Sequence, residues 1–404
     1  MARFEPISGI RYDPDRVDLA DVLSPPYDVI DDEARARLEA RSPHNAVFVE
    51  LGREGADDDR YERAARHLDA WLAEGVLRID EEPSFYVYRM GWHDEAGRAH
   101  QTTGILGGLE VSDPGEGRVL PHERTMGKPK GDRLRLLRAS RANLSPVWCL
   151  SLADGLTELC QVTGPPDGRA TDDDGVHHRL WRITQPGVVA AITEAVGSAP
   201  VVIADGHHRY ETALAYRDER RAITGRTEGD FDQLLALVVE LSEDQLRVQP
   251  IHRLISGLPD DFDLAGALAA FFDIVEIDDP PAPGEITQRM ADAGALALLV
   301  GDRAWLLQPR PAAGTDAVSD DRPDALLLDL ALASLPDHQL DFHQSAEVAA
   351  DMARAGKAQA AVLVRPVAVR HIAATARAGH CMPAKTTFIA PKPRTGLVFR
   401  RLHD

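Results

Sequence analysis

The sequence predicts a mixed α/β (α+β) fold whose centre is a strand, a tight turn and a helix. Segments with the two-residue apolar period of strands alternate along the chain with segments of helical period. The chain has 404 residues, of which 44% are hydrophobic and 27% charged, so it is a globular protein long enough for two or three cores. The central element is a β-branched run over 201–204 that passes through Asp205-Gly206 into a helix whose apolar stripe starts at Tyr210.

The first region, residues 1–160, is expected to combine helices and strands. Its apolar residues follow a helical spacing over 58–73 and then form strand-like runs at 85–88 and 102–111. A basic helix is expected over 131–143, followed by a strand at 146–150. The turn-rich, acidic stretch over 163–175 is interpreted as a surface loop or boundary that carries no chemistry.

A central α/β core is expected over residues 176–256, and a further α+β region over 257–404. The core has a strand near Leu180, a helix over 186–196, the strand-turn-helix and an apolar strand over 234–241. The elements expected in the last region are a helix ending at Phe272, a hairpin over 296–306, helices near Asp324 and Ala346, a strand over 361–364 and a helix ending at Arg377.

Charge and cysteine usage exclude several classes of protein. With 45 basic and 65 acidic residues the net charge is −20, which argues against binding to nucleic acid or to anionic membranes. No apolar run approaches the ~20 residues of a membrane-spanning helix, and the first residues do not read as a signal peptide, so we expect a cytoplasmic protein. Cys149, Cys160 and Cys381 are too far apart for a disulfide framework or a thiolate zinc site. The oligomeric state is left open.

Lysine is rare in this sequence and is concentrated in two segments. Only five of the 45 basic residues are lysine, and four of them lie in two short segments, Lys128 with Lys130 and Lys385 with Lys392. A compact ammonium group is suited to contacts with phosphate groups, so both segments are candidates for nucleotide binding. Chance is the alternative explanation of this clustering.

The central junction combines groups that suit a phosphate. The first N–H groups of a helix and its dipole attract anions, and Gly206 permits close approach of the backbone. Arg209 can hold two phosphate oxygens, His207 or His208 can donate a proton, and Asp205 can bind Mg²⁺ or accept a hydroxyl proton. Adjacent helical residues point about 100° apart, so one histidine is expected to act and the other to support it. The structural alternative is that Asp205 caps the helix and that the histidines pack.

A second polar cluster lies over 122–133 and is expected to be a functional loop that enters a helix. Glu123 is a candidate base or metal ligand, and Lys128, Lys130 and Arg133 are candidates for neutralising phosphates. The alternative is an ordinary charged surface loop. The sequence contains neither a dinucleotide glycine fingerprint nor a GxxxxGK[ST] phosphate loop, so the familiar nucleotide-binding folds are not supported.

Several separated motifs, in order along nearly the whole chain, resemble the bacterial family catalogued as domain of unknown function 1015. These motifs are Pro-Pro-Tyr-Asp-Val at 25–29, Pro-His-Asn at 43–45, His-Glu-Arg-Thr at 122–125, Lys130 with Asp132-Arg133, Ala-Asp-Gly-His-His-Arg-Tyr at 204–210, His252-Arg253, and Met-Pro-Ala-Lys-Thr-Thr at 382–387 through Gly396-Leu397.

The stretch over 205–209 also resembles the phosphate-binding junction of the ParB and sulfiredoxin superfamily, and in particular that of the archaeal free serine kinases. This local resemblance implies a ParB/sulfiredoxin-like strand-turn-helix core with a nucleotide phosphate near His207, His208 and Arg209. It also implies serine or phosphoserine as the partner substrate and an acidic base, which we map to Glu123.

The leading hypothesis is a nucleotide- and Mg²⁺-dependent phosphotransferase or phosphatase acting on a small hydroxyl metabolite. Serine or phosphoserine is the first candidate for this metabolite, and ADP or ATP is the expected phosphoryl acceptor or donor. The expected site comprises catalytic Asp205, His207, His208 and Glu123, phosphate-binding Gly206, Arg209, Lys128, Lys130, Arg133 and Lys385, and metal-binding Asp205 and Glu123. One alternative is a ParB-like nucleotide-binding switch or partner-binding protein with little catalysis. Another is a sulfiredoxin-like redox enzyme, which would carry a cysteine in the turn.

Overall fold

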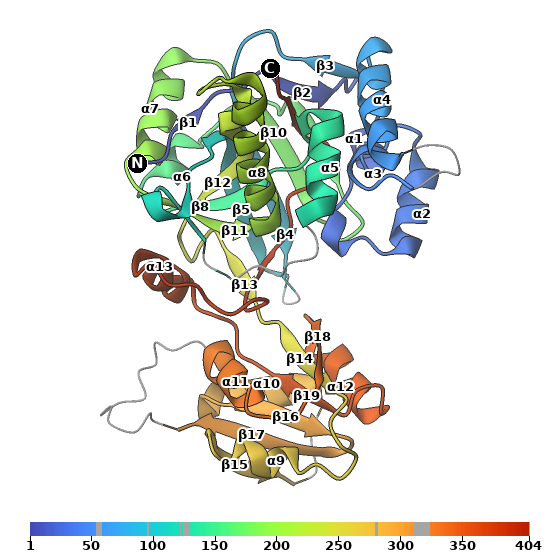
Figure 1. The fold of residues 1–404 in the computed structure, drawn as a ribbon, viewed down its shortest axis with the longest axis vertical. Coiled ribbons are helices and arrows are strands. Elements are labelled where there is room, and N and C mark those ends of the chain that lie inside the picture. Colours follow the sequence, from blue (N-terminus) through green and yellow to red (C-terminus); the bar gives the residue numbers. More distant parts are fainter. Residues whose placement is uncertain are drawn as a thin grey trace. The chain divides into compact units, whose positions relative to one another are not determined.

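The computed structural model describes residues 1–53, 59–94, 97–121, 123, 130–278, 282–310 and 324–403. The chain forms two compact units, Met1–Leu246 with Pro391–Asp404, and Arg247–Ala390 (Figure 1). Both units combine helices and strands, which confirms the predicted mixed α/β fold.

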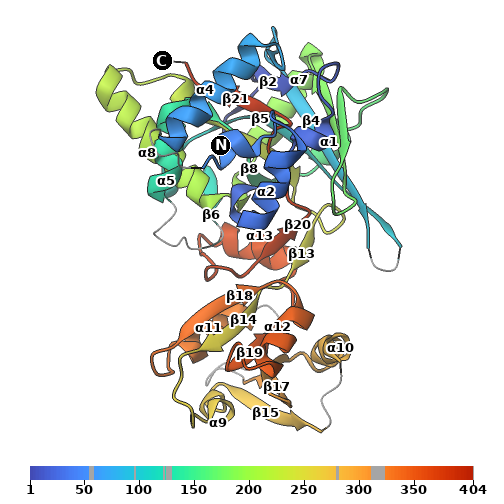
Figure 2. The ribbon, with the colours of Figure 1, turned by 90° about the vertical axis from the view of Figure 1, so that its right-hand side faces the viewer.

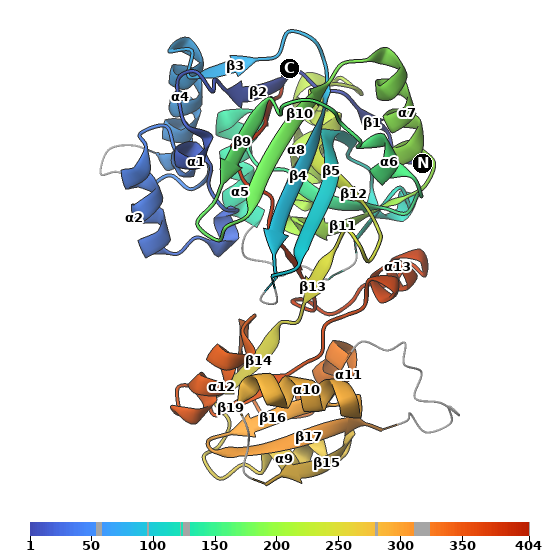
Figure 3. The same ribbon diagram turned by 180° about the vertical axis from the view of Figure 1, so that it is seen from behind.

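The first unit is built on a nine-stranded mixed sheet. Its strands in spatial order are β6 (Val119–Pro121), β11 (Val201–Asp205), β8 (Val147–Ser151), β12 (Gln233–Glu240), β5 (Ala99–Glu110), β4 (Phe85–His93), β10 (His177–Ile183) and β9 (Gly168–Thr171), with β1 (Phe4–Glu5) paired to β5. The pairs β6·β11 and β8·β12 are parallel, and the other neighbours are antiparallel. Figure 3 shows β4, β5, β9 and β10 side by side.

A smaller, four-stranded sheet ties the two ends of the chain together. It consists of β3 (Leu77–Ile79), β2 (Gly9–Tyr12), β21 (Phe399–Arg401) and β7 (Ala142–Asn143) in that order. The helices of the first unit are α1 (Leu19–Val22), α2 (Asp32–Arg41), α3 (Val47–Glu50), α4 (Arg60–Ala73), α5 (Lys130–Ser140), α6 (Leu156–Leu159), α7 (Pro186–Gly197) and α8 (His207–Thr224), with short 3-10 turns η1 (Tyr27–Val29), η2 (Pro114–Glu116) and η3 (Asp230–Asp232).

One core of the first unit lies between the larger sheet and helices α6, α7 and α8. The stripe on α8 enters this core as expected: Tyr210 and Ala213 are buried and Leu214 is partly buried. These side chains pack against alternate residues of the strands, such as Val201 and Ile203 of β11, because successive strand residues face opposite sides of a sheet. Helix α8 therefore starts at the end of β11 with its inner face held by the core.

The three regions predicted from the sequence are arranged as two units. Strands β4, β5, β6 and β8 of the predicted first region share one sheet with β10, β11 and β12 of the predicted central core. The segment 391–404, expected in the C-terminal region, belongs to the first unit, where β21 pairs with β2 and β7. Pairing between distant strands leaves no local signal in the sequence, which is why the grouping differs.

The acidic stretch over 163–175 is also different from the expected surface loop. It contains β9, which pairs with β10, and Asp172, whose carboxylate is 13% exposed and bonded to other elements of the unit. The turn residues around this short strand interrupt the apolar alternation by which strands are predicted from sequence.

The second unit is a six-stranded antiparallel sheet with helices on both faces. Its strands in spatial order are β15 (Phe272–Ile277), β17 (Arg303–Pro309), β16 (Leu296–Val300), β19 (Ala360–Leu363), β14 (His252–Ser256) and β18 (Gln339–His343), and a separate ribbon pairs β13 (Arg247–Gln249) with β20 (Phe388–Ala390). Helices α9 (Leu264–Leu268) and α11 (Asp324–Leu332) cover one face, and α10 (Pro283–Ala293) and α12 (Ala346–Arg354) the other. Helix α13 (Val369–Arg377) follows β19.

The burial of His252 makes the stability of the second unit depend on pH. Burial and the nearby Arg253 and His343 lower the pKa of His252 to about 4, while its Nδ1 accepts the Val364 N–H at 3.2 Å. The unfolded chain binds a proton at this histidine near its ordinary pKa of 6.5, whereas the folded protein binds it only near pH 4. The folded state therefore keeps its full stability above pH 6.5 and loses stability as the pH falls toward 4.

The unfolding free energy should fall between pH 7 and pH 4, and we expect this fall to be about 3 kcal/mol smaller in His252→Asn than in the unaltered chain. The substitution keeps an acceptor near the Val364 N–H. Denaturant unfolding at several pH values measures this difference. His380→Asn, at an exposed histidine of the same unit, is the matched control. An unchanged pH dependence in His252→Asn would contradict the prediction.

No helix within the described ranges is long and apolar enough to cross a membrane.

Candidate functional site

The predicted strand-turn-helix is present at the end of β11. The strand ends at Asp205, Gly206 has a φ of +91°, and α8 begins at His207. A Cβ on Gly206 would also lie 3.0 Å from Nε and Nη2 of Arg209. Glycine is required here both for the left-handed backbone and for the space that the guanidinium occupies.

Asp205 is held between two cations and does not cap the helix. The N-cap position is Gly206, so the structural alternative for Asp205 is wrong. One carboxylate oxygen forms an ion pair with Lys392 Nζ, and the other accepts Arg209 Nη2 at 3.0 Å. Burial favours the neutral acid, but the charges of Lys392, Arg209 and His207 outweigh burial and lower the pKa of Asp205. The carboxylate is therefore ionised at neutral pH.

Arg209 connects Asp205 to a neighbouring strand and to a second group of charges. Its Nη1 donates to the carbonyl of Pro146 at 2.5 Å, immediately before β8. Burial opposes the charge of Arg209, but Asp205, Asp28, Tyr27 and Glu50 raise its pKa. The guanidinium consequently stays charged in a largely enclosed position at the start of α8.

The two predicted histidines lie in the first turn of α8, and both are half-buried. His207 is close enough to Asp205 to influence its pKa, and the carbonyl of His208 accepts the hydroxyl of Thr212 at 2.7 Å. The helix is fixed just after the two histidines, because the hydroxyl of Tyr210 donates to the Ser112 carbonyl at 2.9 Å. The start of α8 therefore holds its polar side chains on a rigid element.

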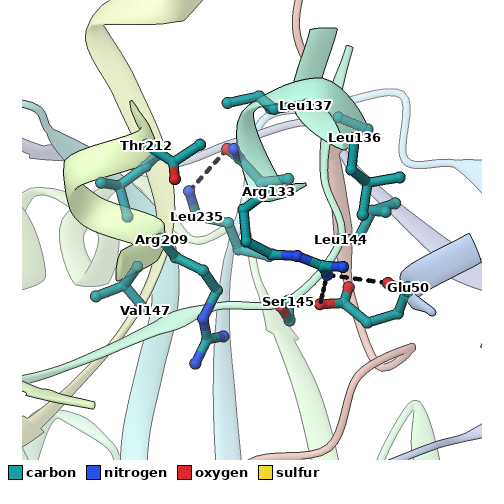
Figure 4. A pocket seen from close by; sticks show the side chains of 13 residues that line it. Glu50, Arg133, Leu136, Leu137, Leu144, Ser145, Val147, Arg209, Thr212 and Leu235 are labelled. Atoms are coloured by element: carbon teal, nitrogen blue, oxygen red, sulfur yellow. Dashed lines mark hydrogen bonds and ion pairs between the residues drawn. The ribbon is translucent and has the colours of Figure 1, made fainter. Parts of the chain in front are cut away.

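Arg133 links a set of buried polar groups beside Arg209. Its guanidinium donates to the Glu50 carbonyl at 2.9 Å, to Glu50 Oε1 at 3.3 Å and to Asp132 at 2.7 Å. It also lies 4.2 Å from the ring centroid of Tyr27, and Ser145 Oγ donates to the same Glu50 oxygen at 3.1 Å (Figure 4). These contacts occupy Arg133, so a direct phosphate contact by this residue stays a prediction.

Glu123 follows the strand next to β11. The parallel pairing of β6 with β11 ends at Pro121 and Ile203, so Glu123, just after β6, and Asp205, the last residue of β11, follow the paired segments at the same end of neighbouring strands. Glu123 is half-buried, and its predicted role as a base stays a prediction.

The predicted lysines are placed only in part. Lys128, like His122 and the stretch from Arg124 to Pro129, lies outside the described residues. Lys130 is the first residue of α5, and its side chain lies outside the described part of the structure. Helix α5 is labelled in Figure 2.

Lys385 belongs to the second unit. It has a φ of +60°, which is unusual for a residue other than glycine, and its carbonyl accepts Arg253 Nη1 at 2.9 Å. Such backbone strain often accompanies function, and its role at the phosphate stays a prediction.

Lys392, in contrast, is brought to Asp205 by a buried network in the same unit. Two residues after it, Arg394 Nε donates to Asp172 at 2.9 Å, and the Arg394 N–H donates to the hydroxyl of Tyr88 at 3.2 Å. His178, which is fully buried, joins Tyr88 at 2.8 Å and Asp172 at 2.8 Å. We call these four residues the Arg394 anchor, and they fix the chain next to Lys392.

We expect Asp172→Asn to loosen the returning C-terminal segment. Burial opposes ionisation of Asp172, but bonds from His178 and Arg394 outweigh burial and keep the pKa of Asp172 low. Its contribution is therefore present above pH 3.8 and lost as the pH falls further. The substitution should cost about 2–3 kcal/mol of unfolding free energy at pH 7 and accelerate amide exchange over 391–398. Asp173→Asn, at the exposed neighbour, is the control; equal exchange in both variants would contradict the role of the anchor.

Sequence reasoning assigned no role to three groups around this site. Glu50, Tyr27 and Asp28 all influence the charge of Arg209, yet they lie more than 150 residues before it in the chain. The Pro-Pro-Tyr-Asp-Val motif at 25–29 was a signal for two of them, whereas nothing local distinguished Glu50.

The surroundings of Asp205 do not fit the predicted Mg²⁺ site. Both of its oxygens are bonded to cationic side chains, which would repel a metal ion. Across the part of the chain that the structure describes, no group of three or more His, Cys, Asp or Glu side chains could hold a metal ion. We therefore derive no step through a protein-bound Mg²⁺ ion.

None of the three cysteines is part of the turn. Cys149 and Cys160 are buried, and burial raises the pKa of the Cys160 thiol to about 12 and that of Cys149 further. Thiols of this kind are poor nucleophiles, which disfavours the sulfiredoxin-like alternative.

Comparisons with known proteins agree with the motif-based resemblance. The family model described as "Protein of unknown function (DUF1015)" matches residues 4–331. No curated protein matches the chain.

Solved structures with similar folds include a conserved hypothetical protein from Pyrococcus furiosus, with 12% identity, a TM-score of 0.38 and coverage of 73% of this chain and 93% of that one. They also include a free serine kinase in complex with AMP, with 13% identity, a TM-score of 0.38 and coverage of 73% and 92%. A third is SbnI with C-terminal truncation from Staphylococcus aureus, with 12% identity, a TM-score of 0.38 and coverage of 72% and 85%.

Proposed function

We propose that this chain, which belongs to the DUF1015 family of proteins of unknown function, is a nucleotide-dependent phosphotransferase or phosphatase acting on a small hydroxyl metabolite. The observation that carries the proposal is the half-buried Asp205 carboxylate between Lys392 and Arg209 at the N-terminus of α8. Two side-chain cations and a helix N-terminus converge there, and together they suit the charge that develops on a transferring phosphoryl group.

The site residues divide into two roles. Arg209 and Lys392 would contact phosphate oxygens, while Asp205 holds both cations in place; a carboxylate with a lowered pKa is a weak base, so positioning suits Asp205 better than proton transfer. Glu123 and one of the two histidines, His207 or His208, are the groups proposed to move the proton of the metabolite hydroxyl. This division modifies the role that the sequence suggested for Asp205.

Serine or phosphoserine is the proposed metabolite, and ADP or ATP the proposed nucleotide. Both assignments follow the resemblance of the stretch over 205–209 to free serine kinases.

Phosphorus NMR of the full chain tests the proposal. The protein is incubated with AMP, ADP or ATP and with serine or phosphoserine, in the presence and absence of MgCl₂. We expect formation or loss of phosphoserine, and a fall of about 100-fold or more in Asp205→Asn, because both cations lose their charged partner. Asp154→Asn, at an exposed aspartate outside the site, is the matched control and should keep full activity.

Two other outcomes would decide against catalysis. Thermal stabilisation by a nucleotide without turnover, retained in Glu123→Gln, would favour the nucleotide-binding switch. The absence of both turnover and nucleotide binding would refute the proposal.

A further inference from the structure

Three arginines lie side by side on one face of the larger sheet. Arg179 of β10 is directly opposite Arg89 of β4 on one side and Arg169 of β9 on the other. Residues opposite each other on neighbouring strands point to the same face, with their Cβ atoms about 4.5–5.5 Å apart. We call these three residues the arginine row, and Figure 3 shows their strands side by side. Strands β8, β12, β5 and β4 separate β10 from β11, so the row is not part of the proposed phosphate site.

The arginine row has no acidic partner within the described ranges. No hydrogen bond or ion pair joins the guanidinium groups of Arg89, Arg169 and Arg179 to another residue there, and Arg89 Nε is buried without a partner. Beyond Arg89 the row ends on β5 at the neutral Thr103. Like charges on directly opposite residues destabilise a sheet, so this face carries a cost that the described residues do not offset.

The acidic residues next to β9 and β10 in the chain are bonded to other groups. Asp172 accepts Arg394 Nε at 2.9 Å, and Asp173 accepts Arg41 Nη2 at 2.8 Å. Asp167 accepts a backbone N–H of β10 at 2.8 Å. The carboxylates that are close to the arginine row in sequence therefore serve other parts of the unit.

Arg89 is the member of the row for which the missing anion matters most. It is half-buried, and burial, together with the smaller effect of the charge of Arg179, lowers the pKa of Arg89. By contrast, Arg182 of β10, which points to the other face, donates to Ser84 Oγ at 2.8 Å and to the Glu82 carbonyl at 3.0 Å. Buried charges are normally paired in this way, so the row is suited to an anion from outside the chain.

The spacing of the arginine row favours a chain of phosphate groups as this anion. Neighbouring strands are about 4.8 Å apart, so three adjacent arginines form a row about 10 Å long. An extended acidic peptide presents side chains on one face only every 7 Å or so, roughly two residues, which matches this spacing poorly. A phosphate chain carries charge on every link, and each guanidinium group can bind phosphate oxygens through paired N–H donors.

We propose that the arginine row binds the phosphate chain of an oligophosphate, either free or as the tail of a nucleoside polyphosphate. The ring next to the row, Trp181, is 8% exposed and has the Arg89 guanidinium carbon 5.0 Å from its centroid, so it is not available for stacking on a base. The contacts are therefore with the phosphates. This site is independent of the proposed function, whose phosphate contacts lie at the start of α8.

Calorimetric titration of the full chain without Mg²⁺, at about 150 mM salt to screen weak surface attraction, tests the binding. The probes are orthophosphate, pyrophosphate, tripolyphosphate, ATP and a glutamate peptide with the charge of tripolyphosphate. We expect tripolyphosphate to bind at least about tenfold more tightly than orthophosphate, because it reaches more than one guanidinium group. Tighter binding of ATP than of tripolyphosphate would identify a nucleotide as the source of the chain, and the reverse order a free oligophosphate.

Arg179→Gln tests the site from the protein side. It should weaken tripolyphosphate binding at least about tenfold, whereas the Tm of the ligand-free chain should stay unchanged or rise, because a charge between two like charges is removed. A purely structural arginine would lower the Tm instead. Arg226→Gln, at an exposed arginine that follows α8, is the matched control and should change neither quantity. Arg169→Gln, on the edge strand, provides the same test if Arg179→Gln does not fold.

Four results would overturn the inference. The first is no binding of any phosphate chain, and the second is equal weakening by Arg179→Gln and Arg226→Gln, which would indicate general surface attraction. The third is tighter binding of the glutamate peptide than of tripolyphosphate. The fourth is loss of tripolyphosphate binding in Arg209→Lys but not in Arg179→Gln, which would place the ligand at the start of α8.

Discussion

Arg209→Lys is expected to lower the rate of phosphoryl transfer by about 10²–10³-fold, the usual effect of removing a hydrogen-bond donor to a developing oxyanion. The guanidinium of Arg209 donates to Pro146 at 2.5 Å and to Asp205 at 3.0 Å from two different nitrogens. A lysine ammonium is a single point charge on a flexible stem and cannot span both partners while facing a phosphate. Lysine retains the positive charge of Arg209, so a lower rate would show the effect of the guanidinium geometry and not of net charge.

The measurement is the initial rate with saturating nucleotide, together with the affinity for that nucleotide. Arg221→Lys is the matched control, because Arg221 lies on the same helix, is 42% exposed and pairs with Asp232 away from the site. We expect the control to keep its rate within about twofold, as exposed ion pairs contribute little. Equal rates for Arg209→Lys and the unaltered chain would remove Arg209 from the proposed mechanism.

Asp80→Asn is expected to lower the unfolding free energy by about 3–5 kcal/mol, which is the usual cost of breaking a buried ion pair. Arg11 donates to both oxygens of Asp80 at 2.7 Å, and these two side chains are only 7% and 6% exposed. The hydroxyl of Tyr86 also donates to Asp80 at 2.7 Å while it accepts the Gly9 N–H at 3.0 Å. The substitution therefore leaves the buried guanidinium of Arg11, a residue of β2, without its counter-ion.

Calorimetry or denaturant unfolding measures this loss, which corresponds to a fall in Tm of roughly 10 °C for a unit of this size. Asp69→Asn is the control, since Asp69 is 58% exposed and pairs with Arg401 at 2.9 Å. Burial opposes ionisation of Asp80, but Arg11 and Tyr86 outweigh burial and lower its pKa. The stabilisation is therefore present above pH 3.8 and lost as the pH falls below it, and an Asp80→Asn variant as stable as Asp69→Asn would contradict this role.

The prediction of the central strand-turn-helix was confirmed because its signals are local. The β-branched strand, the glycine with positive φ and the apolar stripe of α8 involve residues within a few positions of one another. Short-range periodicity and backbone sterics determine such an element almost independently of the rest of the chain. The mixed α/β class followed from the same periodicity.

The ion-pair partner that Asp205 finds in Lys392 could not be predicted from the sequence. Lys392 lies 187 residues from Asp205 in the chain, and the Arg394 anchor that holds it joins residues separated by 222 positions. The acidic stretch over 163–175 was interpreted as a loop without chemistry, and only the pairing of β9 with β10 brings Asp172 into that anchor. Glu50 carries no local signal that distinguishes it from other glutamates.

The sequence by itself determined the strand-turn-helix, the polar residues from Asp205 to Arg209 and the family to which the chain belongs. Only the tertiary structure decided that Lys392 neutralises Asp205, that Glu50 and Arg209 line one cavity, and that the chain's last segment returns to the first unit. The physical reason is that backbone conformation and amphipathic periodicity act over a few residues, whereas ion pairs and cavities depend on strand pairing between segments that the sequence keeps far apart.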